Sequence, residues 1–124
     1  MSINWIDHMD VLPLARSHLF GKIDPVGGIF IGKRPKTIRL DVVTLNLLTC
    51  LIIDEREIAG LVNINIYNED IDRIEQLNVA VIDIMDMAYL EDHLFVFDRQ
   101  YMFRLSRTLH MSNIRMKFTK NNIL

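Results

Sequence analysis

Residues 27–33 have the spacing of a phosphate-binding loop. Four residues separate Gly27 from Gly32 and a lysine follows, as in loops that wrap nucleotide phosphates. Such a loop also needs Ser or Thr after the lysine to hold magnesium, but Arg34 occupies that position. Its interior, residues 29–31, is Ile-Phe-Ile, which favours a strand. We therefore predict a short strand here and no nucleotide site.

Residues of metal-binding or nucleophilic type are scattered along the chain. No two of the four histidines are three or four residues apart: they are His8, His18, His93 and His110. Cys50, the single cysteine, excludes an internal disulfide and lies in an apolar stretch, which predicts a buried, unreactive thiol. Asp83 and Asp86, one helical turn apart, fit an exposed acidic helix face. We predict no catalytic residue, no cofactor and no metal site, and thus no enzyme.

Basic and aromatic residues alternate towards the end of the chain. The bases are Arg99, Arg104, Arg107, Arg115, Lys117 and Lys120, interleaved with Tyr101, Phe103 and Phe118. A platform for single-stranded nucleic acid combines charge and stacking in this way. Tyr101 and Phe103 share one strand face and Arg104 falls on the other, so a core face backed by a charged face fits as well.

Charge is strongly segregated although its total is small. The 124 residues are 50% hydrophobic and 24% charged with a net charge of −2, which predicts one folded domain. Residues 54–92 contain eleven acidic and two basic residues, whereas residues 99–124 contain six basic and no acidic residues. Such segments can attract each other head to tail between copies, or neutralise each other within one chain. The candidate subunit-interface residues are Arg99, Arg104, Arg107, Arg115, Lys117, Asp72, Glu75, Asp83 and Asp86.

Hydrophobic periodicity predicts one domain over residues 1–124. The expected elements are a helix over 2–20, strands over 29–67, a helix over 70–90 and strands over 93–118. Pro13 either kinks the first helix or starts a second one. The predicted class is α+β: a mainly antiparallel β-sheet with an N-terminal helix and one long central helix packed on one face.

Two stretches predict details of these elements. Val62, Ile64 and Ile66 alternate with polar residues, which indicates a strand with one buried face. A polar turn at residues 98–100 predicts a hairpin between strands 93–97 and 101–105.

The order of motifs over residues 37–118 resembles a known family. The strand Gly60-Leu61-Val62-Asn63-Ile64-Asn65-Ile66-Tyr67 is followed by an acid-rich helix start, then by Phe95-Val96-Phe97 and a closing strand at 112–118. This arrangement resembles the tail-completion or tail-terminator proteins of tailed bacteriophages, also described as minor capsid or neck proteins. The resemblance implies a structural virion protein without catalytic residues, forming a ring that is usually hexameric at the junction of tail and neck.

We therefore predict a homo-oligomeric ring, with a hexamer favoured, that joins the tail tube to the head connector or stopper. DNA would pass through it without specific binding, helped by an acidic lumen whose candidate channel-facing residues are Asp54, Glu55 and Glu57. The resemblance implies a location in the virion. Assembly in the host cytoplasm is expected because the sequence lacks a secretory signal and a tract long enough to span a membrane.

The resemblance does not distinguish a tail terminator from other ring proteins of the neck that have the same fold. Two functions of other classes also remain open. One is a small inhibitor or interaction module from a mobile element that acts on a host protein. The other is a single-stranded nucleic-acid binder.

Overall fold

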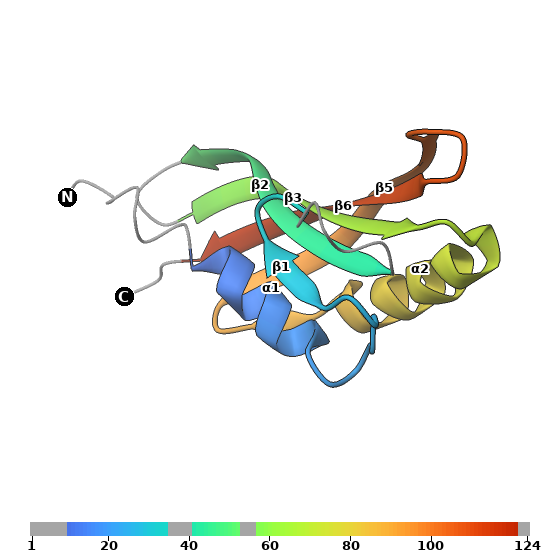
Figure 1. The fold of residues 1–124 in the computed structure, drawn as a ribbon. Helices are drawn as coiled ribbons and strands as arrows, with labels where there is room; N and C mark the ends of the chain where they lie inside the picture. The colour runs from blue at the N-terminus through green and yellow to red at the C-terminus, as the bar shows by residue number, and fades with distance from the viewer. Residues whose placement is uncertain (1–9, 35–40, 53–56, 122–124) are drawn as a thin grey trace.

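The computed structural model describes residues 10–34, 41–52 and 57–121, which form two helices and one six-stranded sheet (Figure 1). In chain order the elements are α1 (Val11–Leu19), β1 (Ile29–Ile31), β2 (Val42–Ile52), β3 (Glu57–Asn68), α2 (Ile71–Met85), β4 (Tyr89–Leu90), β5 (His93–Arg104) and β6 (His110–Asn121). The strand order is β1-β2-β3-β6-β5-β4. Among the six strands of the described residues, β1 and β2 alone pair in parallel, so the predicted α+β class with a mainly antiparallel sheet is confirmed.

Both helices lie on the same face of the sheet (Figure 1). Strand β3 shows why, because Val62, Ile64 and Ile66 are fully buried while the residues between them are only half-buried. These side chains pack in one core with the buried stripes of α1 and α2. Burial of this apolar surface is the main stabilising contribution to the fold.

Helix α1 begins at Val11, and residues 2–9 of the predicted first helix lie outside the described residues. Pro13 falls in its first turn, where a missing backbone N–H costs no intrahelical hydrogen bond. Of the two alternatives for Pro13, the start of a helix is the one observed in this part of the chain. The helix ends at Leu19, and Gly21 follows with φ +81°, a conformation that suits glycine.

Helix α2 is shorter than the predicted helix over 70–90. It ends at Met85, and Met87 adopts a positive φ of 63°. The chain then turns back so that residues 89–90 form β4, and the Ala88 carbonyl accepts a hydrogen bond from the Phe95 N–H. Backbone pairing with β5 therefore replaces the last predicted helical turn, although helical spacing of apolar residues continues as far as Ala88.

The N-terminus of α2 is capped by Asp70, whose carboxylate accepts a hydrogen bond of 3.0 Å from the Asp72 N–H. Replacing Asp70 with alanine should lower the free energy of unfolding by about 1 kcal/mol, because this donor then loses its partner within the chain. Urea unfolding measures the change. Glu75→Ala, which removes the same charge from an exposed position of α2, is the control and should change stability less. Equal effects would contradict a capping role.

The predicted hairpin with a turn at 98–100 is wrong. Residues 93–104 form one strand, β5, with a register irregularity between Phe97 and Arg99, so Asp98 is an extra residue in a bulge. The hairpin instead joins β5 to β6 through residues 105–109, where the Leu105 N–H donates to the Leu109 carbonyl. A polar triplet inside a strand can mark a bulge as well as a turn, and here the strand continues through it.

Candidate assembly interface

Backbone N–H groups on either side of β1 are used in hydrogen bonds to β2 and the residue before it. The N–H groups of Gly27 and Gly32 donate to the carbonyls of Asp41 and Leu45, at 2.7 and 2.8 Å. These N–H groups are therefore not available to bind a phosphate. Residues 29–31 form a strand, as predicted. Among the described residues, no group of three or more His, Cys, Asp or Glu side chains could hold a metal ion.

Two of the three histidines inside the described ranges, and the cysteine, make contacts that hold the fold together. His93 is buried, lies 2.8 Å from the Glu91 carbonyl through Nδ1, and stacks on Phe95. His18 lies 3.2 Å from the Ile84 carbonyl and so connects α1 to the end of α2. Cys50 packs against the core, and burial raises the pKa of its thiol, which lowers the thiolate fraction and the reactivity.

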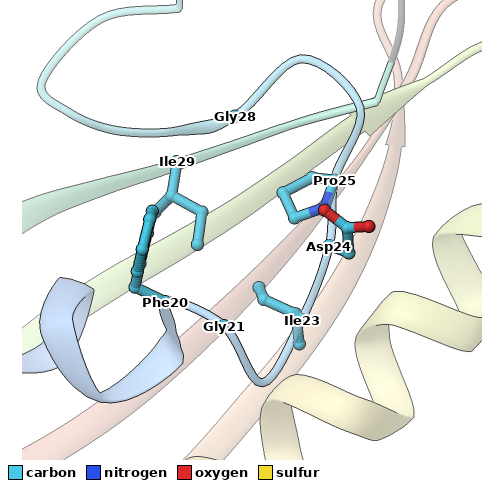
Figure 2. Close-up of a pocket in the computed structure, with 7 residues that line it drawn as sticks. All are labelled: Phe20, Gly21, Ile23, Asp24, Pro25, Gly28 and Ile29. Carbon is cyan, nitrogen blue, oxygen red and sulfur yellow. The ribbon is translucent and has the colours of Figure 1, made fainter.

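A shallow pocket lies between the end of α1 and the start of β1 (Figure 2). Phe20 and Ile29 form one wall, and Ile23, Asp24 and Pro25 lie opposite. The Phe20 side chain is 67% exposed and its ring lies 5.7 Å from the Arg16 guanidinium. The pocket contains one ionisable lining residue and no pair of groups suited to acid–base chemistry.

Strand β5 is covered along only half of its outer side, the side facing away from β6. The covered half pairs with β4 at residues 93 and 94. The Phe97 N–H is then held by the Asp86 carboxylate at 2.9 Å. Beyond the bulge, no strand of the described chain lies beside residues 99–104, which we call the open segment of β5.

The hydrogen-bond pattern shows which backbone groups this segment presents. The Leu105 N–H points towards β6, and in an antiparallel ladder this orientation alternates along the strand. The N–H groups of Gln100, Met102 and Arg104 consequently point to the outer side. Unpaired N–H and C=O groups on a strand edge are a template for adding another strand.

Apolar side chains on the open segment of β5 are exposed on both faces. Tyr101, Met102 and Phe103 are each at least 40% exposed, and Leu105 in the following turn is 49% exposed. The rings of Tyr101 and Phe103 lie 6.2 Å apart. The expectation that these aromatic residues belong to a core face is therefore wrong. Figure 1 shows this end of the hairpin rising away from both helices.

Strand β2 is also without a described neighbouring strand along part of its outer side. Its neighbour β1 covers only residues 43–45, and the remainder, residues 46–52, is the open segment of β2. A bulge at Leu48 interrupts its register with β3, and the Leu48 side chain is 46% exposed. No other strand in the described ranges lies on this side.

The predicted basic interface residues lie on β5, β6 and the turn between them. Lys117 lies 3.5 Å from the Asp98 carboxylate, and the exposed Arg99 lies 3.9 Å from it. A hydrogen bond with the Tyr101 hydroxyl and the nearby Asp98 charge raise the pKa of Arg99. Arg104 donates to the carbonyls of Ser106 and Arg107 and so braces its own turn. Arg115 lies on β6 opposite Arg99, and its buried Nε has no partner among the described residues.

The predicted acidic interface residues lie on α2 and just after it. Asp72, Glu75 and Asp83 are exposed on the helix, whereas Asp86 caps the Phe97 N–H. Within the described residues no ion pair joins these acids to the bases of β5 and β6. Within the described residues, the bases of β5 and β6 are therefore neutralised only through the contacts of Asp98 with Arg99 and Lys117. Of the candidate channel-facing residues, Glu57 begins β3, while Asp54 and Glu55 lie outside the described residues.

Three asparagines, one each from β2, β3 and β6, form a ladder on the sheet face that lies away from the helices. Asn113 donates to Asn65 at 2.7 Å, and Asn65 donates to Asn46 at 3.2 Å. Of the two alternating asparagines in the family resemblance, Asn65 therefore joins β2, β3 and β6 across this face, whereas the buried Oδ1 of Asn63 has no partner among the described residues.

Sequence reasoning missed an ion pair between the nearly buried Asp41 and the half-buried Arg73. The Asp41 carboxylate is nearly buried and accepts from the Val26 N–H at 3.1 Å and from Arg73 Nη2 at 3.2 Å. Arg73 also donates to the Asp24 carbonyl. The only available signal was Arg73 itself, one of two bases in the acidic segment 54–92.

Comparison with known proteins shows a likeness in fold. No protein-family model matches the sequence, and no curated protein matches it. The fold matches a chain in the virion of a native gene transfer agent particle, with a TM-score of 0.58 and 10% sequence identity. The match covers 94% of this chain and 90% of that chain. The two chains thus share their fold over nearly their whole length. No described helix is long and apolar enough to cross a membrane.

Proposed function

We propose that this protein is a structural, non-enzymatic component of a phage-like virion and acts as a subunit of an oligomeric ring at the tail–neck junction. The observation that carries the proposal is the shared fold with a chain of a gene transfer agent virion. The order of motifs that resembles tail-completion and tail-terminator proteins points in the same direction.

The open segments of β2 and β5 support self-association. They lie on opposite edges of the sheet, so a contact between them is head to tail, and such contacts close into a ring when the rotation permits. Exposed acids on α2 and bases on β5 and β6 would help to set the register between copies. In this proposal a hexamer caps the tail tube and faces the connector or stopper, with DNA passing through its lumen.

The purified protein should form rings. We expect light scattering to give a mass of several subunits, and negative-stain electron microscopy to show a central hole wide enough for duplex DNA. Comparing the mass at low and high salt shows how much charge contributes to the contact between subunits, because salt screens exposed charges. A monomer at every concentration and salt would contradict the proposal.

A second candidate function is binding of single-stranded nucleic acid. It is favoured by the exposed Tyr101–Phe103 pair on the same sheet face as Arg99 and Lys117. A salt-dependent gel shift of single-stranded DNA, lost in both Tyr101→Ala and Arg115→Ala, would favour this function. Absence of a shift at low salt would exclude it.

A further inference from the structure

We propose that copies of this chain join through one continuous sheet, in which the open segment of β5 in one copy pairs antiparallel with the open segment of β2 in the next. The inference rests on the proposed ring and names the contact that builds it. Its partner is a second copy of this chain, and the bonds are main-chain hydrogen bonds between residues 99–104 and residues 46–52.

The two open segments occupy diagonally opposite corners of the sheet. One row of cross-strand partners runs from Phe30 on β1 to Tyr101 on β5 and ends there at an open edge. Its members are Phe30, Thr44, Asn65, Asn113 and Tyr101. The other runs from Thr49 on β2, open on its outer side, to Val96 on the covered half of β5; its members are Thr49, Leu61, Lys117 and Val96. Each row therefore has one covered end and one open end.

Strand direction fits the same contact. Strands β2, β3, β6 and β5 are antiparallel at each step, so β5 runs opposite to β2. A neighbouring copy that keeps the same face of the sheet outward presents its β2 antiparallel to β5. The added pair then has the geometry that already dominates this sheet.

Side chains on both segments suit burial. Tyr101, Met102, Phe103 and Leu48 are all between 40% and 46% exposed in the single chain. Strand addition would cover part of this surface while it satisfies the N–H groups of Gln100, Met102 and Arg104. A long apolar edge with unpaired backbone groups otherwise leads to uncontrolled pairing.

Charge selects β2 as the partner over a second β5. Antiparallel pairing of two open β5 segments would bring together two segments that each carry Arg99 and Arg104 and no acidic residue, and such like charges repel. Pairing with β2 instead brings Arg99 towards the end of β2 that leads into Asp54 and Glu55. This choice makes the contact head to tail rather than a two-fold dimer.

Cysteine cross-linking tests which strands meet. In a Cys50→Ala background we compare Leu48→Cys, Met102→Cys and the double variant, each treated with a short bis-maleimide. We expect a ladder of dimer, trimer and higher bands for the double variant and only monomer bands for the single variants. A dimer band from Met102→Cys alone would overturn the proposal in favour of β5–β5 pairing.

Met102→Pro tests the main-chain hydrogen bonds. Proline removes an N–H that points to the outer side, where an edge strand tolerates it, so pairing with β6 is kept. We expect a rise of about tenfold or more in the dissociation constant for assembly, with Met102→Val as the matched control that keeps the N–H. Circular dichroism checks that both variants are folded.

The outcomes separate this inference from the ring itself. If wild-type rings form but Met102→Pro assembles like Met102→Val, or the double-cysteine variant gives no ladder, continuous pairing is overturned and the ring proposal stands. If the wild-type chain is always monomeric, both proposals fall. If Met102→Pro is unfolded, the cross-linking pattern alone decides.

Discussion

Replacing Asp41 with alanine is expected to lower the free energy of unfolding by about 2–3 kcal/mol. The Asp41 side chain is 5% exposed, and its carboxylate accepts hydrogen bonds from the Val26 N–H and from Nε and Nη2 of Arg73. Its loss leaves those donors facing an uncharged methyl group. The Arg73 side chain is 33% exposed, so water can solvate part of its charge, and this keeps the effect below that of a fully buried pair.

Urea unfolding measures this change, and Asp24→Ala is the matched control. Asp24 is an exposed acid in the same region, and its contact with Arg73 is through its main-chain carbonyl, which alanine retains. We expect the control to change stability by less than about 0.5 kcal/mol. If both variants unfolded at the same urea concentration, net charge rather than the Asp41 bonds would be responsible.

Replacing Gly60 with valine should destabilise the chain by about 3 kcal/mol or more. A Cβ atom added at Gly60 would overlap the Thr49 carbonyl on β2 and would lie 2.6 Å from the Phe118 ring. Both neighbours are constrained, because the carbonyl belongs to the backbone and Phe118 is buried in the core. The strand pair or the ring must therefore shift.

Ala59→Val provides the control for Gly60→Val. Ala59 precedes Gly60 on β3, so its side chain points to the opposite face of the sheet, and a β-branched residue suits a strand. We expect a change of less than about 1 kcal/mol in thermal or urea unfolding. Comparable losses in the two variants would show that β3 tolerates no added volume on either face, and the specific contacts of Gly60 would then not explain the effect.

Local periodicity was enough to predict the fold class, the short strand at 29–31 and the two faces of β3. Val62, Ile64 and Ile66 identify a half-buried strand because the side-chain period of a strand is two. The same reasoning failed at the end of α2 and at residues 98–100. In both places long-range pairing decides the structure, since Ala88 bonds to Phe95 and β5 remains paired with β6 through its bulge.

Only part of the candidate interface could be predicted from the sequence. Charge segregation drew attention to Arg99, Arg104 and Lys117, which do lie on the last two strands. It could not show that the outer side of β5 is open, because that depends on how far β4 extends along it. Asp86 was predicted to contact another subunit, but its carboxylate holds a backbone N–H of its own chain. Its role in a subunit contact remains a prediction.

The position of β6 in the middle of the sheet has a consequence for synthesis. β6 lies between β3 and β5, yet it follows both of them along the chain. While the chain is being made, β3 and β5 each lack their shared neighbour until residues 110–121 have left the ribosome. Such non-local pairing is slow to form, and unpaired strand edges are prone to aggregation. The nascent chain should therefore depend on chaperones or rapid release until its central strand is in place.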